Sequence, residues 1–162
     1  MAVVALQISP LPSHVRTARL VAVAAARRAG LPDELVDELR LALGEAASRA
    51  VGLHARHAPD VPVSVTVHDN PGGLTVSVSD RGPAAGPAPG ELSEGLFDGA
   101  QGAGGEEHEL LGSLVDPDVS LAVVTSLVDE VTVDHGADGT TVTMRWPLPP
   151  SAAPGGTAVA AT

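Results

Sequence analysis

The segment "LGEAASRAV" (residues 43–51) places two charged side chains, Glu45 and Arg49, four positions apart among small and apolar residues. A glutamate held in a helix can act as a general base, and an arginine can neutralise phosphate. Residues four positions apart also lie on the same helix face, where opposite charges pair. We expect Glu45 and Arg49 to form an ion pair, with direct contact of Arg49 to phosphate as the alternative.

Two further segments place polar residues where an element begins or ends. In "VSDRGPAAG" a strand-like run ends at Asp80 and is followed by Gly82. Aspartate at such a point is common turn chemistry. In "DVSL" a helix-like run begins with Asp118 and Ser120. Asp118 is suited to cap this helix by accepting hydrogen bonds from its first backbone N–H groups.

Metal binding and hydrolysis receive no support from the motifs. The chain has six histidines and no cysteine. His54 and His57 are near the end of a predicted helix, where histidine usually complements the helix dipole. No HExxH or GxSxG motif occurs, so we predict neither a metal site nor a serine hydrolase.

The first part of the chain predicts a strand and two helices. Residues 2–8 alternate weakly and are rich in valine, which favours a strand. Ser13 is expected to cap a helix that ends at Ala29 before Gly30, and Asp33 is expected to cap a second one. The predicted buried stripes are Val15, Ala18, Ala22, Ala25 and Ala26 in the first helix, and Leu35, Leu39, Leu43, Ala46, Ala47 and Ala50 in the second.

The rest of the chain predicts two hairpins separated by a helix. Runs 61–69 and 74–80 alternate around the turn residues 70–73, and a second hairpin surrounds residues 136–139. Between the hairpins, residues 118–130 predict a helix. Its expected inward residues are Val119, Val123, Leu127 and Ala122. These elements predict an α+β two-layer sandwich, with a mixed, mostly antiparallel five-stranded sheet and three helices on one face.

Composition limits the domain organisation and the partners. We expect one domain over residues 1–148, with a long loop rich in Gly, Pro and acid over residues 83–117, and a disordered tail over residues 149–162. The net charge of −11 argues against binding to nucleic acid or to an anionic membrane surface. Seven of the nine arginines lie between Arg16 and Arg56, which favours this region for an acidic protein partner. No leader or membrane-spanning run is evident, which favours a cytoplasmic protein.

The order of elements and several motifs resemble the GHKL (histidine kinase-like) ATPases, and within them the anti-sigma regulatory factors that double as serine protein kinases. "HVRTARLVAVAAARRAGLPDELVDELRLALGEAASRAV" is similar to the first two helices of that family, and "TSLVDEVTVDHGADGTTVTMRW" to its closing helix and hairpin. Residues 45–54 are similar to E-A-x-S-R-A-V-G-L-H of actinobacterial members encoded beside a STAS-domain antagonist. The resemblance covers about residues 1–148 and implies that residues 83–117 form a lid.

The family motifs that bind nucleotide are altered here. In the family motif E-x-x-x-N the glutamate acts as base or orients the attacking hydroxyl, and the asparagine binds Mg²⁺. Glu45 keeps the first position, but Arg49 replaces the asparagine and offers five donors and no acceptor. In D-x-G-x-G, whose aspartate binds adenine, Asp80 and Gly82 remain, but the second glycine is absent.

The third family motif, G-x-G-L, cradles the phosphates at a helix start, and here Asp118 and Ser120 replace both of its glycines. A carboxylate at that place would repel phosphate. The resemblance therefore implies only a remnant nucleotide site. Its residues would be Glu45, Arg49, Asp80, Gly82, Asp118 and Ser120.

The resemblance implies a regulatory protein of the anti-sigma type in a partner-switching pathway, with no catalytic residue, no metal and no cofactor expected. Its partners would be a sigma factor, a STAS-domain anti-anti-sigma protein, or both, and a homodimer through the sheet is implied as well. Arg16 and Arg19 are the residues that we expect at the partner interface. The main alternative is an active serine/threonine kinase that uses Mg-ATP with Glu45 as base. A third possibility is a pseudokinase that binds nucleotide without metal.

Overall fold

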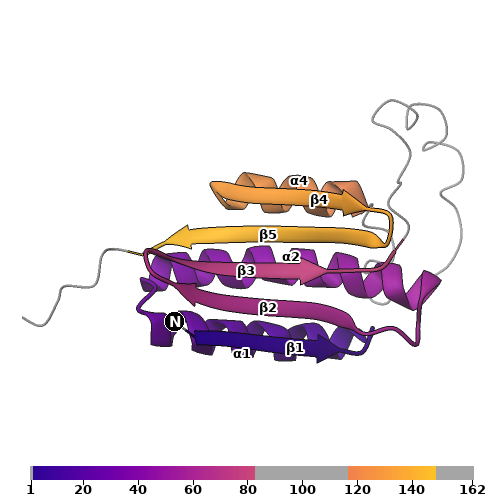
Figure 1. The fold of residues 1–162 in the computed structure, drawn as a ribbon, viewed down its shortest axis with the longest axis horizontal. Helices are drawn as coiled ribbons and strands as arrows, with labels where there is room; N and C mark the ends of the chain where they lie inside the picture. Colours follow the sequence, from indigo (N-terminus) through magenta and orange to yellow (C-terminus); the bar gives the residue numbers. More distant parts are fainter. Residues whose placement is uncertain (1, 83–116, 149–162) are drawn as a thin grey trace, which may run out of the picture.

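The chain folds into two layers, a five-stranded sheet and a layer of helices (Figure 1). The structure is a computed structural model that describes residues 2–82 and 117–148. Its elements in chain order are β1 (Ala2–Ile8), α1 (Pro12–Ala29), α2 (Asp33–His57), β2 (Val63–Asn70), β3 (Gly73–Ser79), α4 (Pro117–Leu127), β4 (Glu130–Gly136) and β5 (Gly139–Pro147). The expected α+β sandwich is confirmed. Of the loop expected over residues 83–117, residues 83–116 lie outside the described residues, and Pro117 is the first residue of α4. The tail expected over residues 149–162 also lies outside them.

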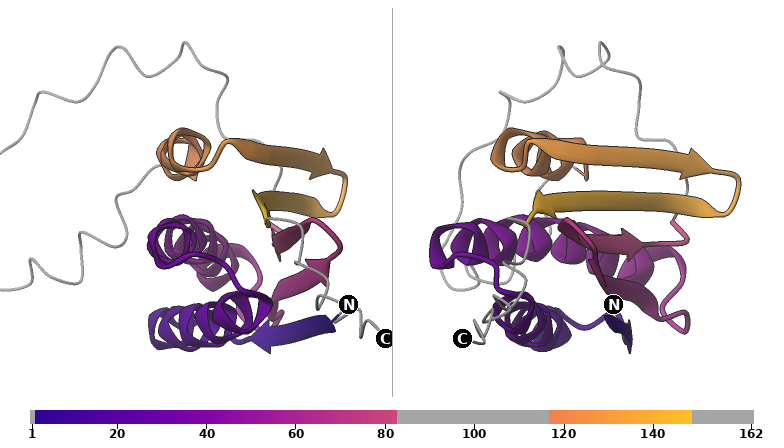
Figure 2. Two further views of the ribbon diagram at one scale, coloured as in Figure 1. Left: turned by 90° about the vertical axis from the view of Figure 1, so that its left-hand side faces the viewer. Right: turned by 60° about the vertical axis from the view of Figure 1, so that its left-hand side comes forward.

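The described strands form one sheet in the order β1-β2-β3-β5-β4, and every neighbouring pair is antiparallel. The expectation of a mixed sheet is therefore wrong for these strands. Alternating valines line one face, as in the row that pairs Val65 with Val78 and Val78 with Val142. The three described helices cover this face, and Figure 2 shows them on the same side of the sheet. On the opposite face, the three central strands β2, β3 and β5 carry mainly serine and threonine.

The core between the two layers is almost wholly aliphatic. The predicted stripe of α1 is buried at every position, and so is that of α2 except for Leu35, which is half-buried. Among the described residues, Trp146 of β5 is the one large aromatic side chain in this core. It is 1% exposed, and its indole N–H donates a hydrogen bond to Glu38 Oε1 at 2.8 Å. This bond joins the last strand to α2.

The helix starts differ from the expected caps. Pro12 occupies the first position of α1, where its fixed φ suits a helix, and Leu11 rather than Ser13 is the N-cap residue. Asp33 lies inside the first turn of α2 and makes no side-chain cap, so its role as a cap is wrong as well. The expected end of α1 is confirmed, because Gly30 adopts the left-handed φ of 87°. Among the described helices, none combines the length and the apolar character needed to span a bilayer.

The expected inward face of α4 is largely wrong. Val119 and Val123 are 54% and 36% exposed and Ala122 is exposed, whereas Leu127 is half-buried. The buried residues are Ser120 and Val124 of α4 and Val128 just after it, and Leu121 and Leu127 pack partly buried against the core. Apolar residues occupy nearly every side of this helix, so their spacing does not select a face. The contacts of α4 with α2 and β4 select it instead.

Candidate functional site

The structure brings together three of the residues expected in the remnant nucleotide site. Arg49 on α2 donates a hydrogen bond from Nη1 to Oδ2 of Asp80, which follows β3, at 2.6 Å. The two side chains are 6% and 2% exposed, so this is a buried ion pair. Gly82 lies beside it and donates its backbone N–H to Asp80 Oδ1 at 3.0 Å.

The expected pairing of Arg49 with Glu45 is wrong. Glu45 is half-buried and makes no ion pair with the described residues, whereas Arg49 turns toward the sheet. A buried guanidinium needs a carboxylate that is buried as well, because a solvated partner leaves most of its desolvation cost in place. Asp80 meets that need because α2 packs against β3.

Both oxygens of the Asp80 carboxylate are engaged by the protein. Oδ2 accepts the bond from Arg49, and Oδ1 faces the backbone N–H groups of Gly82 and Thr140 at 3.0 and 3.4 Å. The backbone N–H of Asp80 in turn donates to the carbonyl of Thr140 at 2.9 Å. Asp80 therefore connects α2, the segment after β3 and the start of β5.

His54 forms a second buried link at the same end of α2. Its side chain is fully buried, with Nδ1 2.7 Å from the carbonyl oxygen of Val61. Its Nε2 accepts the backbone N–H of Arg81 at 2.7 Å. A carbonyl only accepts, so Nδ1 carries the proton and the ring is the neutral tautomer. The expected role of His54 as a charged complement to the helix dipole is therefore wrong. Its spacing from Ala47 and Ala50, which places it on the buried stripe, was the signal that could have revealed this.

Gly139 allows the turn between β4 and β5 to approach Asp80. Its φ of 136° lies in the region that favours glycine. A side chain there would meet the carbonyl oxygen of Asp80 and would come within 2.7 Å of the Cα of Arg81. The sequence pattern predicts this glycine only as part of a hairpin turn.

The remaining predicted residues are placed apart from the ion pair. Ser120 is buried on α4, where it faces the core, and the side chain of Asp118 lies outside the described residues. On α1, Arg16 is exposed and Arg19 is half-buried, at the outer surface of the helix layer. Within residues 2–82 and 117–148, no three His, Asp or Glu side chains gather as a metal site would require.

The donor set around Asp80 does not suit a hydrated magnesium ion. Magnesium requires oxygen ligands, and Arg49 supplies only N–H donors. The Nε of Arg49 is buried and finds no acceptor among the described residues. The arrangement holds Arg49, Asp80 and the adjoining backbone in one conformation.

Comparisons with known proteins identify the domain type. The sequence pattern of the histidine kinase-like ATPase domain matches residues 8–146. The fold is similar to the crystal structure of the RsbU and RsbW domains of Rv1364c from Mycobacterium tuberculosis, with 20% sequence identity and a TM-score of 0.59. That similarity covers 90% of this chain but only 32% of the other, and at this identity it shows a shared fold. No protein with curated functional information matches.

Replacing Arg49 by methionine is expected to lower the free energy of unfolding by about 3–5 kcal/mol, because it leaves the Asp80 carboxylate buried and unpaired. Unfolding by urea, followed through Trp146 fluorescence, measures the loss. The double variant Arg49→Met/Asp80→Asn keeps an acceptor for Gly82 and removes the charge, so it should recover part of the loss. Equal losses in the single and double variants would contradict a buried ion pair.

Gly139→Ala is expected to lower the free energy of unfolding by more than about 1 kcal/mol, because the new methyl group meets the backbone of Asp80 and Arg81. Gly52 is the matched control, since a Cβ at this helical position has no neighbour within 4 Å. Gly52→Ala should stabilise the protein by about 0.5–1 kcal/mol. The same urea titration compares the two, and a Gly139→Ala protein as stable as the parent would refute the close approach.

Proposed function

We propose that this chain, which belongs to the histidine kinase-like ATPase domain family, is an anti-sigma-type regulatory protein that acts by binding other proteins and transfers no phosphate. Its partners would be a sigma factor, a STAS-domain anti-anti-sigma protein, or both, in a partner-switching pathway. The fold similarity to a chain that contains an RsbW domain supports this assignment. The observation that carries it is the buried ion pair between Arg49 and Asp80.

The ion pair joins two positions to which the family resemblance gives separate roles in binding Mg-ATP. Arg49 stands at the position of the metal-binding asparagine, and Asp80 at that of the aspartate that accepts the adenine amino group. The Asp80 side chain is only 2% exposed, so adenine could reach its carboxylate only if Arg49 or the adjoining backbone moved away. Releasing Arg49 would leave a guanidinium buried without its carboxylate, at a cost of about 3–5 kcal/mol. Nucleotide binding would therefore have to overcome the cost of breaking this buried ion pair.

A surface formed by α1 and α2 supports the protein-binding part of the proposal. This α1–α2 surface consists of Arg16, Arg19, Leu20, Leu41 and Gly44. The side chain of Arg19 crosses α2 at Gly44, where an added Cβ would lie 3.3 Å from its Cδ. Leu20 follows Arg19 in the sequence and is 62% exposed, and Leu41 of α2 is 52% exposed. Neither arginine forms an ion pair with the described residues.

The charges and apolar side chains of this surface suit an acidic partner that also offers apolar residues. Leu41 lies one turn before Gly44, and Arg16 lies one turn before Arg19, so the five residues share one side of the helix layer. Arginines at the rim of such a patch can pair with carboxylates of a partner, while the leucines supply apolar area. Gly44 keeps room for the stem of Arg19, and this fixes where its guanidinium is presented.

Isothermal titration of the protein with ATP and Mg²⁺ is expected to show no saturable binding up to millimolar nucleotide. The reason is that Asp80 is already bound by Arg49 and two backbone N–H groups. A phosphate-transfer assay on a STAS-domain partner should give no product. Saturable binding that is lost in Glu45→Ala, together with transfer, would establish the kinase instead. Binding that is unaffected by EDTA would establish a pseudokinase.

Arg19→Ala is expected to weaken partner binding by about tenfold or more, because a charge-assisted hydrogen bond contributes about 1.5–3 kcal/mol. The partner is obtained by co-purification from the native organism and identified by mass spectrometry, and its Kd is then measured with purified proteins. Arg28→Ala is the matched control, since Arg28 is exposed on the same helix and lies outside the α1–α2 surface. A partner other than a sigma factor or STAS-domain protein, or equal effects of the two variants, would contradict the proposal.

A further inference from the structure

A cavity of about 400 Å³ lies on the face of the sheet opposite α2, beside the turn between β4 and β5. Its floor includes Ser64, Ser79 and Thr141, which are neighbours on β2, β3 and β5. These residues alternate along their strands with the buried valines, so their hydroxyls face away from the helices. Ser79 Oγ and Thr141 Oγ1 are hydrogen-bonded at 2.9 Å. The volume falls in the range of small-molecule sites.

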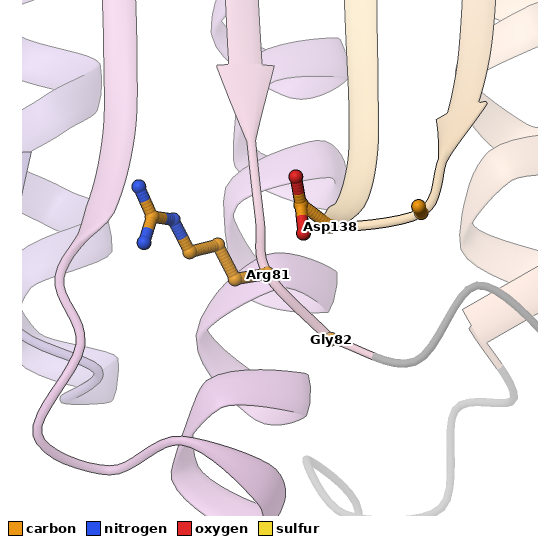
Figure 3. A pocket seen from close by; sticks show the side chains of 4 residues that line it. Arg81, Gly82 and Asp138 are labelled. Carbon is orange, nitrogen blue, oxygen red and sulfur yellow. The ribbon is translucent and has the colours of Figure 1, made fainter.

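Opposite charges flank this hydroxyl floor. Arg81, Asp134 and Asp138 line the cavity and are all exposed. Figure 3 shows the Arg81 side chain extending from the end of β3 toward β2, whereas Asp138 lies on the turn at the β5 side. Among residues 2–82 and 117–148, these three side chains form no ion pair. A neighbouring cavity of about 460 Å³ is also lined by Arg81 and Asp138, so the two cavities adjoin at the turn between β4 and β5.

Both sides of the cavity are held by the buried hydrogen bonds described above. The backbone N–H of Arg81 is bound to His54 Nε2 at 2.7 Å, which fixes the base of its side chain. The turn that carries Asp138 is held by the backbone bond between Asp80 and Thr140. A site whose supports are already ordered loses little conformational entropy when a ligand binds.

We propose that this cavity binds a small zwitterionic compound. Its carboxylate would pair with Arg81, its ammonium group with Asp138 and Asp134, and its polar body with the hydroxyl floor. Guanidinium and carboxylate match each other as a two-donor, two-acceptor pair. A ligand with only a negative charge would meet two carboxylates, and one with only a positive charge would meet Arg81. The compound could be a free amino-acid-like metabolite or the zwitterion of a short peptide, and this inference does not depend on the proposed regulatory function.

The test is a titration of the full chain, labelled with ¹⁵N, with zwitterions of increasing charge separation: glycine, β-alanine, γ-aminobutyrate and ε-aminocaproate. One length should bind best and shift the amide resonances of Arg81, Gly136 and Gly139 to saturation. Butyrate and butylamine, which carry one charge each, should bind about tenfold more weakly or worse. Glycylglycine distinguishes the two sources, because tighter binding than the best free amino acid would indicate a peptide.

Two variants and one control locate the binding. Arg81→Gln and Asp138→Asn should each weaken binding by about tenfold. Both side chains are exposed, so the variants should remain folded, which the spectra themselves report. Arg28→Gln, an exposed arginine on α1, should leave the affinity within twofold. The proposal is overturned if no compound gives saturable shifts, if the single-charge compounds bind equally well, or if Arg81→Gln and Asp138→Asn bind like the parent.

Discussion

The buried ion pair between Arg49 and Asp80 is the interaction on which the rest of the site depends. It connects the middle of α2 to the end of β3, over 31 positions of sequence. Pairs of this kind add little net stability, because the attraction mainly offsets the loss of hydration. Their effect is on conformation, because neither charge can leave the other without remaining buried alone. The pair therefore fixes how α2 lies against the sheet at this point.

The conformation of the backbone around the ion pair depends on the same buried groups. Asp80 and His54 together accept the N–H groups of Arg81, Gly82 and Thr140, so the segment after β3 is held from both layers. Gly139 is the one residue of the turn that permits this approach. On the helix side the network joins Arg49 and Asp80, two residues that the family resemblance associates with nucleotide binding. On the opposite side the same bonds present Arg81 and Asp138 at the edge of a cavity.

Much of the fold could be predicted because its signals are local. The alternating valines of β2 and β3 fix both the strands and their buried face, and Gly30 ends α1 through its own backbone conformation. The buried face of α4 could not be predicted, because apolar residues lie on nearly every side of that helix. Only its contacts with other elements determine which of them are buried. The order of elements was enough to predict the α+β sandwich, but it was not enough to predict that every pair of neighbouring strands is antiparallel.

In the site, too, features within one helix could be predicted from the sequence, whereas contacts between distant elements could not. The spacing of Glu45 and Arg49 describes one helix and cannot reveal a partner on a distant strand. The prediction that Arg49 cannot bind a metal ion needs no structure, because it rests on the chemistry of guanidinium alone. Its bond to Asp80, and the neutral tautomer of His54, depend on which groups the fold buries together. Burial of charge, rather than spacing, decided the pairing.

A crystal structure of the protein grown with Mg²⁺ and a non-hydrolysable ATP analogue tests the central claim most directly. We predict that Arg49 Nη1 and Asp80 Oδ2 remain within hydrogen-bond distance and that no purine density appears beside Asp80. A purine whose amino group donates to Asp80, with Arg49 turned away and a magnesium ion near Glu45, would contradict the account.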